Sequence, residues 1–538
     1  MEAISSRGHW SAFSETPADY GDAEAGRTAF QGYRDRRFPL DQPATTAWVG
    51  EEHSPYGFDL GVTYPQPEID GLLAAMAAAL PGWRDAGIDA RAGVCLEALA
   101  RLNARSQDIA QAVMHTTGQG FAMAFQAGGP HAQERGLEAL AYTVAAMRRV
   151  PEAARWEKPQ GKRPTLLMEK RFHVVPRGLA LVIGCNTFPT WNSYPGIFAS
   201  LAAGNPVLVK PHPRAVLPLA ITVGVIRDLL HELGLDPNVV CLAAERSEQR
   251  LAATLAIRPE VRIIDFTGST AFGEWLEANA RQAAVFTEKA GVNTVVIDST
   301  DDYAGMLRNL AFTLSLYSGQ MCTTSQNLFI PEGGIDTDAG HRSFDEVSGD
   351  LAGAIDSLLS EPARAAALLG ALVSDAVLAR LEHCPSMGTV VLPSRAVPHP
   401  EFPAAVVRTP LLLRVSAADR EAYGSECFGP VTFLVATSGT TESLAIWRRT
   451  LTDRGALTAG VYSTDPAVTR EAETIALEGG VALSLNLTGG VYVNQSAAFS
   501  DYHATGANPA ANATYTDDAF VSPRFRVVEV RWHHPAAG

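Results

Sequence analysis

Three short stretches of this sequence combine residue types that could carry out covalent chemistry. Cys322 stands in GQMCTTSQN, Glu288 ends the apolar run of VFTEK, and FTGST places Gly268 just after another apolar run. A thiolate is a strong nucleophile, a carboxylate can take a proton from water, and a glycine turn before a helix can hold an anion. Taken singly, the three stretches are also typical of inert packing, a solvated carboxylate and an ordinary capped helix.

The glycine turn is the first hint of a dinucleotide site in the sequence. A G-x-G-x-x-G fingerprint is absent, but FTGST follows a strand-like run and opens a predicted helix. Gly268 permits a close backbone approach, and the free amides of Ser269 and Thr270 would face an anion at the helix N-terminus. The simpler interpretation is a strand–turn–helix with a capping hydroxyl.

The composition excludes several kinds of partner. The 538 residues carry 43 Lys and Arg against 58 Asp and Glu, a net charge of −15. This charge does not suit nucleic acid or an anionic membrane, and no apolar run approaches the ~20 residues that span a bilayer. The N-terminus lacks the features of a signal peptide. The cysteines form no C-x-x-C pair, which argues against metal and disulfides and favours a cytoplasmic protein: Cys95, Cys185, Cys241, Cys322, Cys384 and Cys427.

The order of segments predicts an α/β fold. Residues 1–66 are rich in Gly, Pro, Asp and Ser and predict an extended arm, after which helical periodicity begins near Asp70. From about 177 to 288, short apolar runs alternate with helical stretches, which is typical of a parallel sheet covered on both faces. A second α/β stretch follows from Gly291 to about Asn486.

Two strand-like segments lie outside this alternation. PTLLMEKRFHVVP, residues 164–176, predicts paired strands, and RFRVVEVRW, residues 524–532, predicts a strand with no obvious sheet of its own. Such a strand can be added to the sheet of another chain. The alternative is that it covers an edge in its own chain.

The three stretches occur in one order with PVLVKP and ECFGPV, and together these motifs resemble the aldehyde dehydrogenase superfamily. The resemblance runs from about Asp70 to the final strand. It implies a Rossmann-type cofactor domain from residues 1–150 and 177–288, and an α/β catalytic domain over 289–490. Residues 151–176 and 491–538 would form a small β bridging domain, and the protein would be a homodimer or a dimer of dimers.

The resemblance also implies roles for individual residues. Cys322 would add to an aldehyde, hydride would leave to a nicotinamide, and Glu288 would activate the water that cleaves the resulting thioester. No metal is implied. The resemblance assigns cofactor contacts to five residues: Lys210, Gly268, Ser269, Glu426 and Phe428.

The oxyanion donor has three candidates in the sequence, because the segment GCNTFPTWN departs from the family pattern. The family's asparagine falls at the position of Thr187, and Asn186 stands one residue earlier. We favour Asn186, because an amide is the better donor for an oxyanion. Thr187 remains an alternative, and Asn192 is a third candidate. Trp191, Met321 and Thr323 are expected to line the substrate tunnel.

A second departure concerns the cofactor. NAD-preferring relatives often carry a glutamate three residues after the ribose lysine, where this chain has Pro213. Without that carboxylate, Lys210, His212 and Arg214 could approach a 2′-phosphate. We therefore predict NADP, with NAD as the alternative.

A third departure indicates a branch of the superfamily. The stretch EKAGVN lacks the family's second lysine, and the tail from residue 493 to 520 is distinctive. With CNTFP, these features resemble the stand-alone PaaN-type enzymes of aerobic phenylacetate breakdown and, more distantly, the dehydrogenase part of PaaZ. The substrate implied is a CoA-linked semialdehyde. The alternatives are a CoA-acylating enzyme, which would generally lack Glu288, a broad-range aldehyde scavenger and a non-catalytic scaffold.

Overall fold

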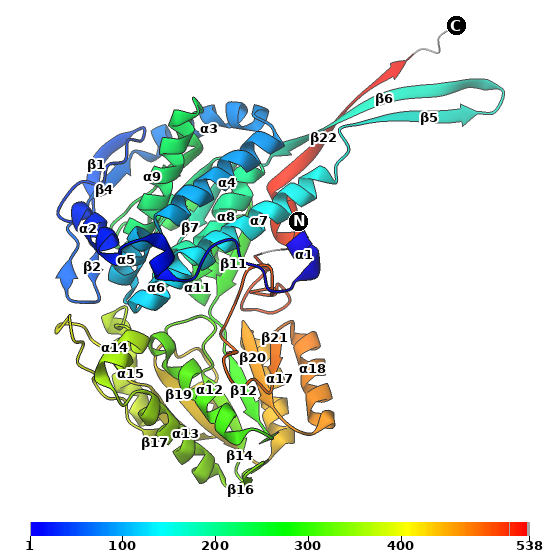
Figure 1. The fold of residues 1–538 in the computed structure, drawn as a ribbon. Coiled ribbons are helices and arrows are strands. Elements are labelled where there is room, and N and C mark those ends of the chain that lie inside the picture. The colour runs from blue at the N-terminus through cyan, green and yellow to red at the C-terminus, as the bar shows by residue number, and fades with distance from the viewer. Residues whose placement is uncertain (1, 516, 535–538) are drawn as a thin grey trace.

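The computed structural model describes residues 2–515 and 517–534. The chain forms two bodies, each built on its own large sheet, and a narrow three-stranded sheet projects from one of them (Figure 1). Each large sheet is covered by helices on both faces. This arrangement confirms the predicted α/β fold class.

The five-stranded parallel sheet has the order β11-β10-β7-β8-β9. Side chains of β7 alternate between its faces: Leu181 packs with Leu72 of one helix layer, and Val182 packs with Ile197 of the other. The strands are β7 (Leu179–Ile183), β8 (Val207–Lys210), β9 (Val240–Leu242), β10 (Val261–Gly268) and β11 (Ala284–Lys289). The first layer holds α3 (Ile69–Asp85), α10 (Leu251–Ala256) and α11 (Thr270–Asn279), and the second holds α4 (Ile88–Ala104), α5 (Ser106–Thr117), α7 (Pro130–Arg148), α8 (Pro189–Ala202) and α9 (Leu217–Glu232).

The seven-stranded sheet has the order β17-β18-β19-β14-β12-β20-β21 and is parallel except for the antiparallel pair β17–β18. Its strands are β12 (Thr294–Ile297), β14 (Asn327–Pro331), β17 (Thr389–Leu392), β18 (Leu411–Ser416), β19 (Val431–Thr437), β20 (Thr458–Tyr462) and β21 (Ala482–Leu485). One face packs on α12 (Tyr303–Ser315), α13 (Phe344–Leu358) and α14 (Pro362–Leu369), and the other on α15 (Asp375–His383), α16 (Arg420–Tyr423), α17 (Thr440–Arg454) and α18 (Pro466–Gly479).

The final strand pairs within its own chain. β22 (Phe525–His534) runs antiparallel to β6 (Arg163–Pro176), from Phe525 opposite Pro176 onward, and β6 also pairs with β5 (Ala153–Gln160). The strand therefore has a sheet within its own chain, which the sequence did not indicate, and its addition to the sheet of another chain stays a prediction. The partner strand lies far away in the sequence, so no local pattern indicated the pairing.

The N-terminal arm is more regular than its composition predicts. Residues Ala23–Tyr33 form helix α2, which Asp22 caps by accepting from the Glu24 amide at 2.9 Å. The arm also contains α1 (Glu2–Ser6), β1 (Thr45–Val49), β2 (His53–Ser54), β3 (Phe58–Asp59) and β4 (Tyr64–Pro67). The prediction of an extended arm is wrong for α2, because its buried face packs on α5, which is a tertiary contact.

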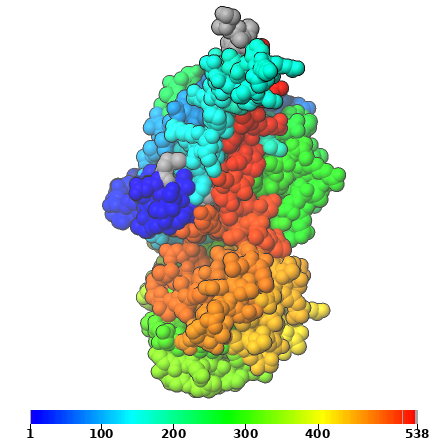
Figure 2. All heavy atoms as spheres, turned by 90° about the vertical axis from the view of Figure 1, so that its right-hand side faces the viewer, coloured from blue at the N-terminus to red at the C-terminus, as the bar shows by residue number. Residues whose placement is uncertain are grey.

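Among its described residues, the segment between β21 and α19 (Asp518–Val521) forms no helix or strand, and it returns from one body to the other. Figure 2 shows this C-terminal part, coloured orange to red, running along the face of the molecule between the two bodies. Asn512 joins it to the edge strand β11: its amide donates to the Thr287 carbonyl at 3.1 Å, and its side chain accepts from the Thr287 amide at 2.8 Å. The tail therefore covers the end of the five-stranded sheet.

The remaining helix and strands are short: α6 (Phe121–Gly128), β13 (Ser299–Thr300), β15 (Ile335–Thr337) and β16 (Gly340–Arg342). Short 3-10 turns are η1 (Pro17–Tyr20), η2 (Pro237–Val239), η3 (Leu316–Gly319), η4 (Cys384–Met387) and η5 (Ser522–Arg524). Within the part of the chain that the structure describes, no helix combines the length and apolarity needed to cross a membrane.

Candidate active site

Several predicted site residues lie at one edge of the five-stranded sheet. Lys210 ends β8, Gly268 ends β10, and Glu288 stands next to the end of β11. The register pairs Thr267 with Glu288, so the glycine turn and the carboxylate are neighbours. Asn186 follows β7 at the same edge. This is the carboxyl edge of a parallel sheet, where ligand sites of such folds gather.

Cys322 reaches this edge from the other body, and an unusual turn directs its loop. After α12, Tyr317, Ser318 and Gly319 have φ values of 51°, 50° and 64°, so three successive residues are left-handed. Such backbone is costly for residues other than glycine and must be held by its surroundings. The Ser318 hydroxyl lies 3.1 Å from the carbonyl oxygens of both Leu369 and Arg408. The loop before Cys322 is therefore fixed by contacts outside it.

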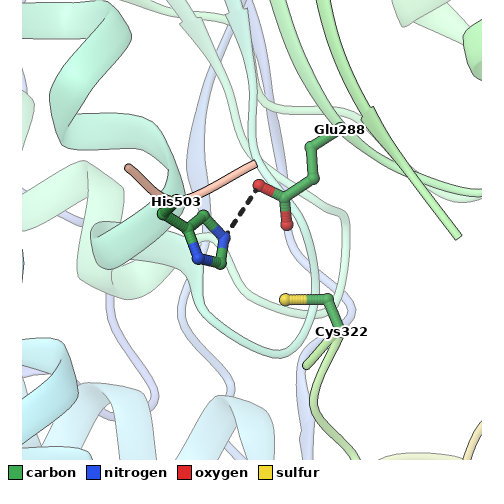
Figure 3. A group of neighbouring side chains, drawn as sticks. All are labelled: Glu288, Cys322 and His503. Atoms are coloured by element: carbon green, nitrogen blue, oxygen red, sulfur yellow. Dashed lines mark ion pairs between the residues drawn. The ribbon is translucent and has the colours of Figure 1, made fainter. Parts of the chain in front are cut away.

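The structure brings Cys322 and Glu288 together and adds a third residue, His503 (Figure 3). The thiol sulfur, a carboxylate oxygen and an imidazole nitrogen all lie within 4.8 Å of one another. His503 Nε2 is 3.3 Å from Glu288 Oε2, and the two residues are 7% and 1% exposed. His503 comes from the tail, and the sequence prediction missed it because a single histidine in a loop carries no motif.

The pKa values of Glu288 and Cys322 are shifted in opposite directions by their surroundings. Burial raises the pKa of Glu288, but attraction to His503 and polar contacts with His503, Tyr515 and Cys322 outweigh it, so the pKa lies below its usual value. Burial and the Glu288 carboxylate hold the pKa of the Cys322 thiol well above its usual value. The carboxylate is therefore ionised while the thiol keeps its proton, and a nucleophile at this position needs a base.

Lys210 has a partner that the sequence prediction did not include. Its ammonium forms an ion pair with Glu245, which follows β9, and both residues are buried. Burial lowers the pKa of Lys210, and Glu245 opposes that shift. Burial and the charges of Lys210 and Arg214 lower the pKa of His212 to about 4, so His212 is neutral near pH 7. A carboxylate is thus present beside the lysine, supplied by a neighbouring strand.

The glycine turn is shaped for close approach. A side-chain carbon at Gly268 would meet the Phe266 ring at 2.6 Å, which no folded chain accommodates without movement. Ser269 is the N-cap of α11, yet its side chain makes no capping hydrogen bond. The first amides of α11 are therefore available to an anionic group.

Glu426 and Phe428 lie beside the cysteine loop. Gln326, four residues after Cys322, accepts from the Cys427 amide at 2.5 Å and donates to the Ser425 carbonyl at 3.0 Å. A small cavity there is lined by both segments, including Met321, Thr324, Glu426 and Phe428. The segments that contain Cys322 and Glu426 are far apart in sequence and together line this cavity.

The asparagine candidates differ in their surroundings. Asn192 is occupied: its side chain donates to the Tyr515 hydroxyl at 3.1 Å and lies 3.5 Å from the Cys185 sulfur. Thr187 contacts the same sulfur at 3.9 Å. The Oδ1 of Asn186 is buried, with no partner among the described residues. Asn186 is therefore the candidate whose carbonyl oxygen is left unpaired.

The three residues expected to line the substrate tunnel have different surroundings. Trp191 is buried and packs edge-on against the His503 ring, with centroids 4.8 Å apart. The Thr323 hydroxyl lies 3.4 Å from the Asn494 carbonyl oxygen of the tail. Met321 lines the small cavity beside Glu426.

Comparison with known proteins agrees with this geometry. The sequence profile of the aldehyde dehydrogenase family matches residues 63–508. The crystal structure of an NAD-dependent aldehyde dehydrogenase from Burkholderia multivorans is 56% identical and superposes with a TM-score of 0.97, covering 99% of this chain and 96% of that one. An N-succinylglutamate 5-semialdehyde dehydrogenase from Chromobacterium violaceum is 26% identical over 404 residues, which are 74% of this chain and 76% of the relative.

A more distant structure shares the fold. A 1-pyrroline-5-carboxylate dehydrogenase from Thermus with bound NAD is 20% identical, with a TM-score of 0.72 over 95% of each chain. The profile match and the 56% identical structure together decide the family. The chain belongs to the aldehyde dehydrogenase family.

Proposed function

We propose that this enzyme oxidises an aldehyde to a carboxylic acid through a thiohemiacetal and a thioester on Cys322. The observation that carries the proposal is the Cys322 sulfur within 4.8 Å of a Glu288 carboxylate oxygen, beside the Gly268 turn. A bound nicotinamide cofactor supplies the hydride acceptor. The Cys322 backbone amide and the Asn186 side chain are the donors proposed for the oxyanion.

Hydrolysis is the proposed end of the reaction. Glu288 is buried, its pKa lies below the usual value, and neither carboxylate oxygen has a partner in hydrogen-bond geometry among the described residues. Such a carboxylate is ionised and free to accept a proton from water. The second candidate, transfer of the acyl group to free CoA, has no need of this base.

We propose that NAD is the preferred cofactor, with NADP accepted less well. Glu245 places a negative charge beside Lys210, where a 2′-phosphate would be repelled. His212 is neutral near pH 7, and Arg214 alone remains as an exposed cation in that turn. These observations reverse the preference expected from Pro213. The proposed contacts to the cofactor are made by Lys210, Gly268, Ser269, Glu426 and Phe428.

The proposed substrate is a semialdehyde, and in its narrowest form a CoA-linked semialdehyde of aerobic phenylacetate breakdown. The N-succinylglutamate 5-semialdehyde dehydrogenase named above acts, by name, on a semialdehyde. The phenylacetate assignment rests on the resemblance of CNTFP, EKAGVN and the tail to PaaN-type enzymes. A broad-range aldehyde scavenger is the alternative within the same chemistry.

The proposed domains follow the sheets, with a cofactor domain over 1–150 and 177–288 and a catalytic domain over 289–490. In the proposed bridging part, β5, β6 and β22 form the projecting sheet. Val527, Val528 and Val530 of β22 are 47%, 47% and 48% exposed. Exposed valines on both faces of a projecting sheet support a homo-oligomer formed through it.

The test is an absorbance assay for reduced nicotinamide. The enzyme is given NAD or NADP, an unmodified aldehyde panel and a CoA-linked semialdehyde, each with and without free CoA. Reduction of NAD without free CoA supports the proposal, and a preference for the CoA-linked substrate supports its narrow form. Turnover that requires free CoA would show that acyl transfer to CoA ends the reaction.

A further inference from the structure

We propose that His503 is a catalytic residue: its imidazole takes the proton of the Cys322 thiol and then remains, as an imidazolium, between the thiolate and the Glu288 carboxylate. The inference rests on the proposed thiol chemistry and adds to it the base that starts each reaction. The sequence motifs described above do not include this histidine.

The geometry places His503 beside both groups. Its Nε2 is 3.3 Å from Glu288 Oε2, and the sulfur of Cys322 lies within 4.8 Å of the cluster's nitrogen and oxygen atoms. Figure 3 shows the imidazole, the thiol and the carboxylate converging on one point. Nε2 has no partner in hydrogen-bond geometry among the described residues, although it is buried. A buried ring nitrogen that lies near a thiol and makes no hydrogen bond of good geometry can accept the thiol's proton.

The hydrogen bonds behind the ring select the tautomer that is needed. His503 Nδ1 lies 3.3 Å from the Ser496 hydroxyl oxygen. That oxygen also accepts from Arg135 Nη2 at 2.5 Å and lies 3.2 Å from both carboxylate oxygens of Asp501. The Asp501 carboxylate can only accept, so Ser496 donates its proton there and its remaining lone pair faces Nδ1. Nδ1 therefore carries a ring proton, so Nε2 is the nitrogen that can take the proton of Cys322, and the imidazolium formed in this way attracts Glu288.

The ring is also held in place sterically. Trp191 packs edge-on against it at a centroid distance of 4.8 Å and an interplanar angle of 83°, and the Tyr515 ring lies 5.6 Å away. Arg135 ion-pairs with Asp501 at 2.8 Å and stands 5.1 Å over the Trp191 ring. The tail loop that carries His503 is thus anchored to helix α7, and the imidazole has little freedom to turn away.

Charged groups of both signs lie around the ring. Glu288 and Asp501 are the acidic groups that act on His503, and Arg135 is the cation behind it. Tyr515 contacts Glu288, while Cys185 and Glu426 act on Cys322. A thiolate formed without a partner would be a second buried anion beside the Glu288 carboxylate. An imidazolium between the two anions removes that repulsion.

The proton and electron changes balance at each step. The S–H bond of Cys322 breaks, its electron pair stays on sulfur, and an N–H bond forms at Nε2. Sulfur then adds to the aldehyde carbon, and the C=O electron pair moves to oxygen. A nicotinamide held at the cofactor site would accept the hydride as the thioester forms. Glu288 takes a proton from water as the water oxygen attacks the thioester carbon, and the C–S bond breaks to give the acid. The proton on Glu288 and that of the product acid then pass to solvent. Sulfur departs as the thiolate that the imidazolium retains.

The experiment measures how the rate of Cys322 alkylation by iodoacetamide depends on pH, with no aldehyde present. Wild-type enzyme is compared with His503→Gln and with a Cys322→Ser background. Buffers contain EDTA, because a thiol, an imidazole and a carboxylate can also bind zinc. For His503→Gln we expect alkylation about tenfold slower at pH 7, a midpoint moved to higher pH, and an unchanged limiting rate at alkaline pH. Ser496→Ala should move the midpoint in the same direction by less.

A structural role of His503 would give a different result. Loss of packing alone would lower the limiting rate or the melting temperature without moving the midpoint. His131→Gln, which removes a histidine that pairs with Glu15 instead, should match wild type. An unmoved midpoint in folded His503→Gln overturns the proposal. Added imidazole should restore alkylation at pH 7 to a His503→Ala variant.

A second measurement needs no variant at His503. Thiolate absorbance near 240 nm is titrated in wild-type enzyme and in Cys322→Ser, and the difference reports the ionisation of Cys322. If the absorbance of wild type exceeds that of Cys322→Ser already near neutral pH, the proposal is supported. If the two differ only at strongly alkaline pH, the proposal is overturned. Both measurements are made without substrate, so failure of aldehyde oxidation in the absorbance assay is a separate result.

Discussion

The side-chain amide of Asn293 donates a hydrogen bond of 2.7 Å to the backbone carbonyl oxygen of Cys322. The same amide donates to the Thr324 carbonyl at 3.1 Å, and its oxygen accepts from the Leu457 and Thr458 amides at 2.9 and 3.0 Å. Asn293 thus joins the start of β12 to the cysteine loop and to the start of β20. It belongs to EKAGVN, the stretch that departs from the family pattern.

Replacing Asn293 with Asp should impair catalysis. Asp keeps the size and the acceptor but loses both donors, and its carboxylate would face the Cys322 carbonyl oxygen. We expect kcat/KM to fall about tenfold to a hundredfold, because the thiol is no longer held in place. Steady-state kinetics measure the loss. Asn279→Asp on the exposed end of α11 is the matched control, and an equal loss in that variant would rule out a specific role for Asn293.

Replacing Glu288 with Gln should separate the two halves of the reaction. Thiol addition and hydride transfer would still occur, but water would lack its base, so the thioester would accumulate. We expect a burst of reduced nicotinamide of about one equivalent, followed by turnover slowed about 10²–10⁴-fold. Stopped-flow absorbance and intact mass measure the burst and the acylated chain. Steady turnover at the wild-type rate would contradict a role for Glu288 in hydrolysis.

Replacing Glu245 with Gln should shift the cofactor preference. The change removes the negative charge beside Lys210, so a 2′-phosphate would meet the lysine without repulsion. We expect the ratio of kcat/KM for NADP to that for NAD to rise about tenfold. Glu248→Gln makes the same charge change at an exposed position in the same loop and should leave the ratio unaltered. A constant ratio in both variants would exclude Glu245 as the determinant.

Glu52 should make stability depend on pH. It is buried and accepts from the Val216 and Leu217 amides at 2.6 and 2.9 Å, at the start of α9, and burial raises its pKa to about 7. Between the usual carboxyl value and pH 7, the folded state keeps a proton that the unfolded state loses. The contribution to stability is therefore greatest at low pH and falls as pH rises through this window, by roughly 3 kcal/mol.

Glu52→Gln should remove this dependence. Its melting temperature relative to wild type should rise from pH 5 to pH 7.5 and then level off, as measured by differential scanning calorimetry. Glu51→Gln, at the neighbouring position where the side chain contacts Ser247, is the control. If the difference in melting temperature between Glu52→Gln and wild type stays constant over this range, Glu52 titrates at the same pH in the folded and unfolded states.

Much of the architecture was determined by the sequence alone. Apolar runs such as LALVI and VLVK are short and evenly spaced between helical stretches, and this local pattern predicted both large sheets. The order of FTGST, VFTEK and GQMC indicated Cys322 and Glu288, because each motif carries its residues within a few positions. The structure then placed these two side chains in one cluster.

Other features were decided only by the tertiary structure. His503 and Glu245 stand in loops with no periodicity, and their partners, Glu288 and Lys210, lie in different segments of the chain. The pairing of β22 with β6 likewise joins strands about 350 residues apart in sequence. Local propensity and spacing report on neighbours along the chain, whereas these contacts depend on the path of a long tail over folded elements. Which carboxylate meets Lys210, and which imidazole meets Cys322, is therefore fixed only when the whole chain has packed.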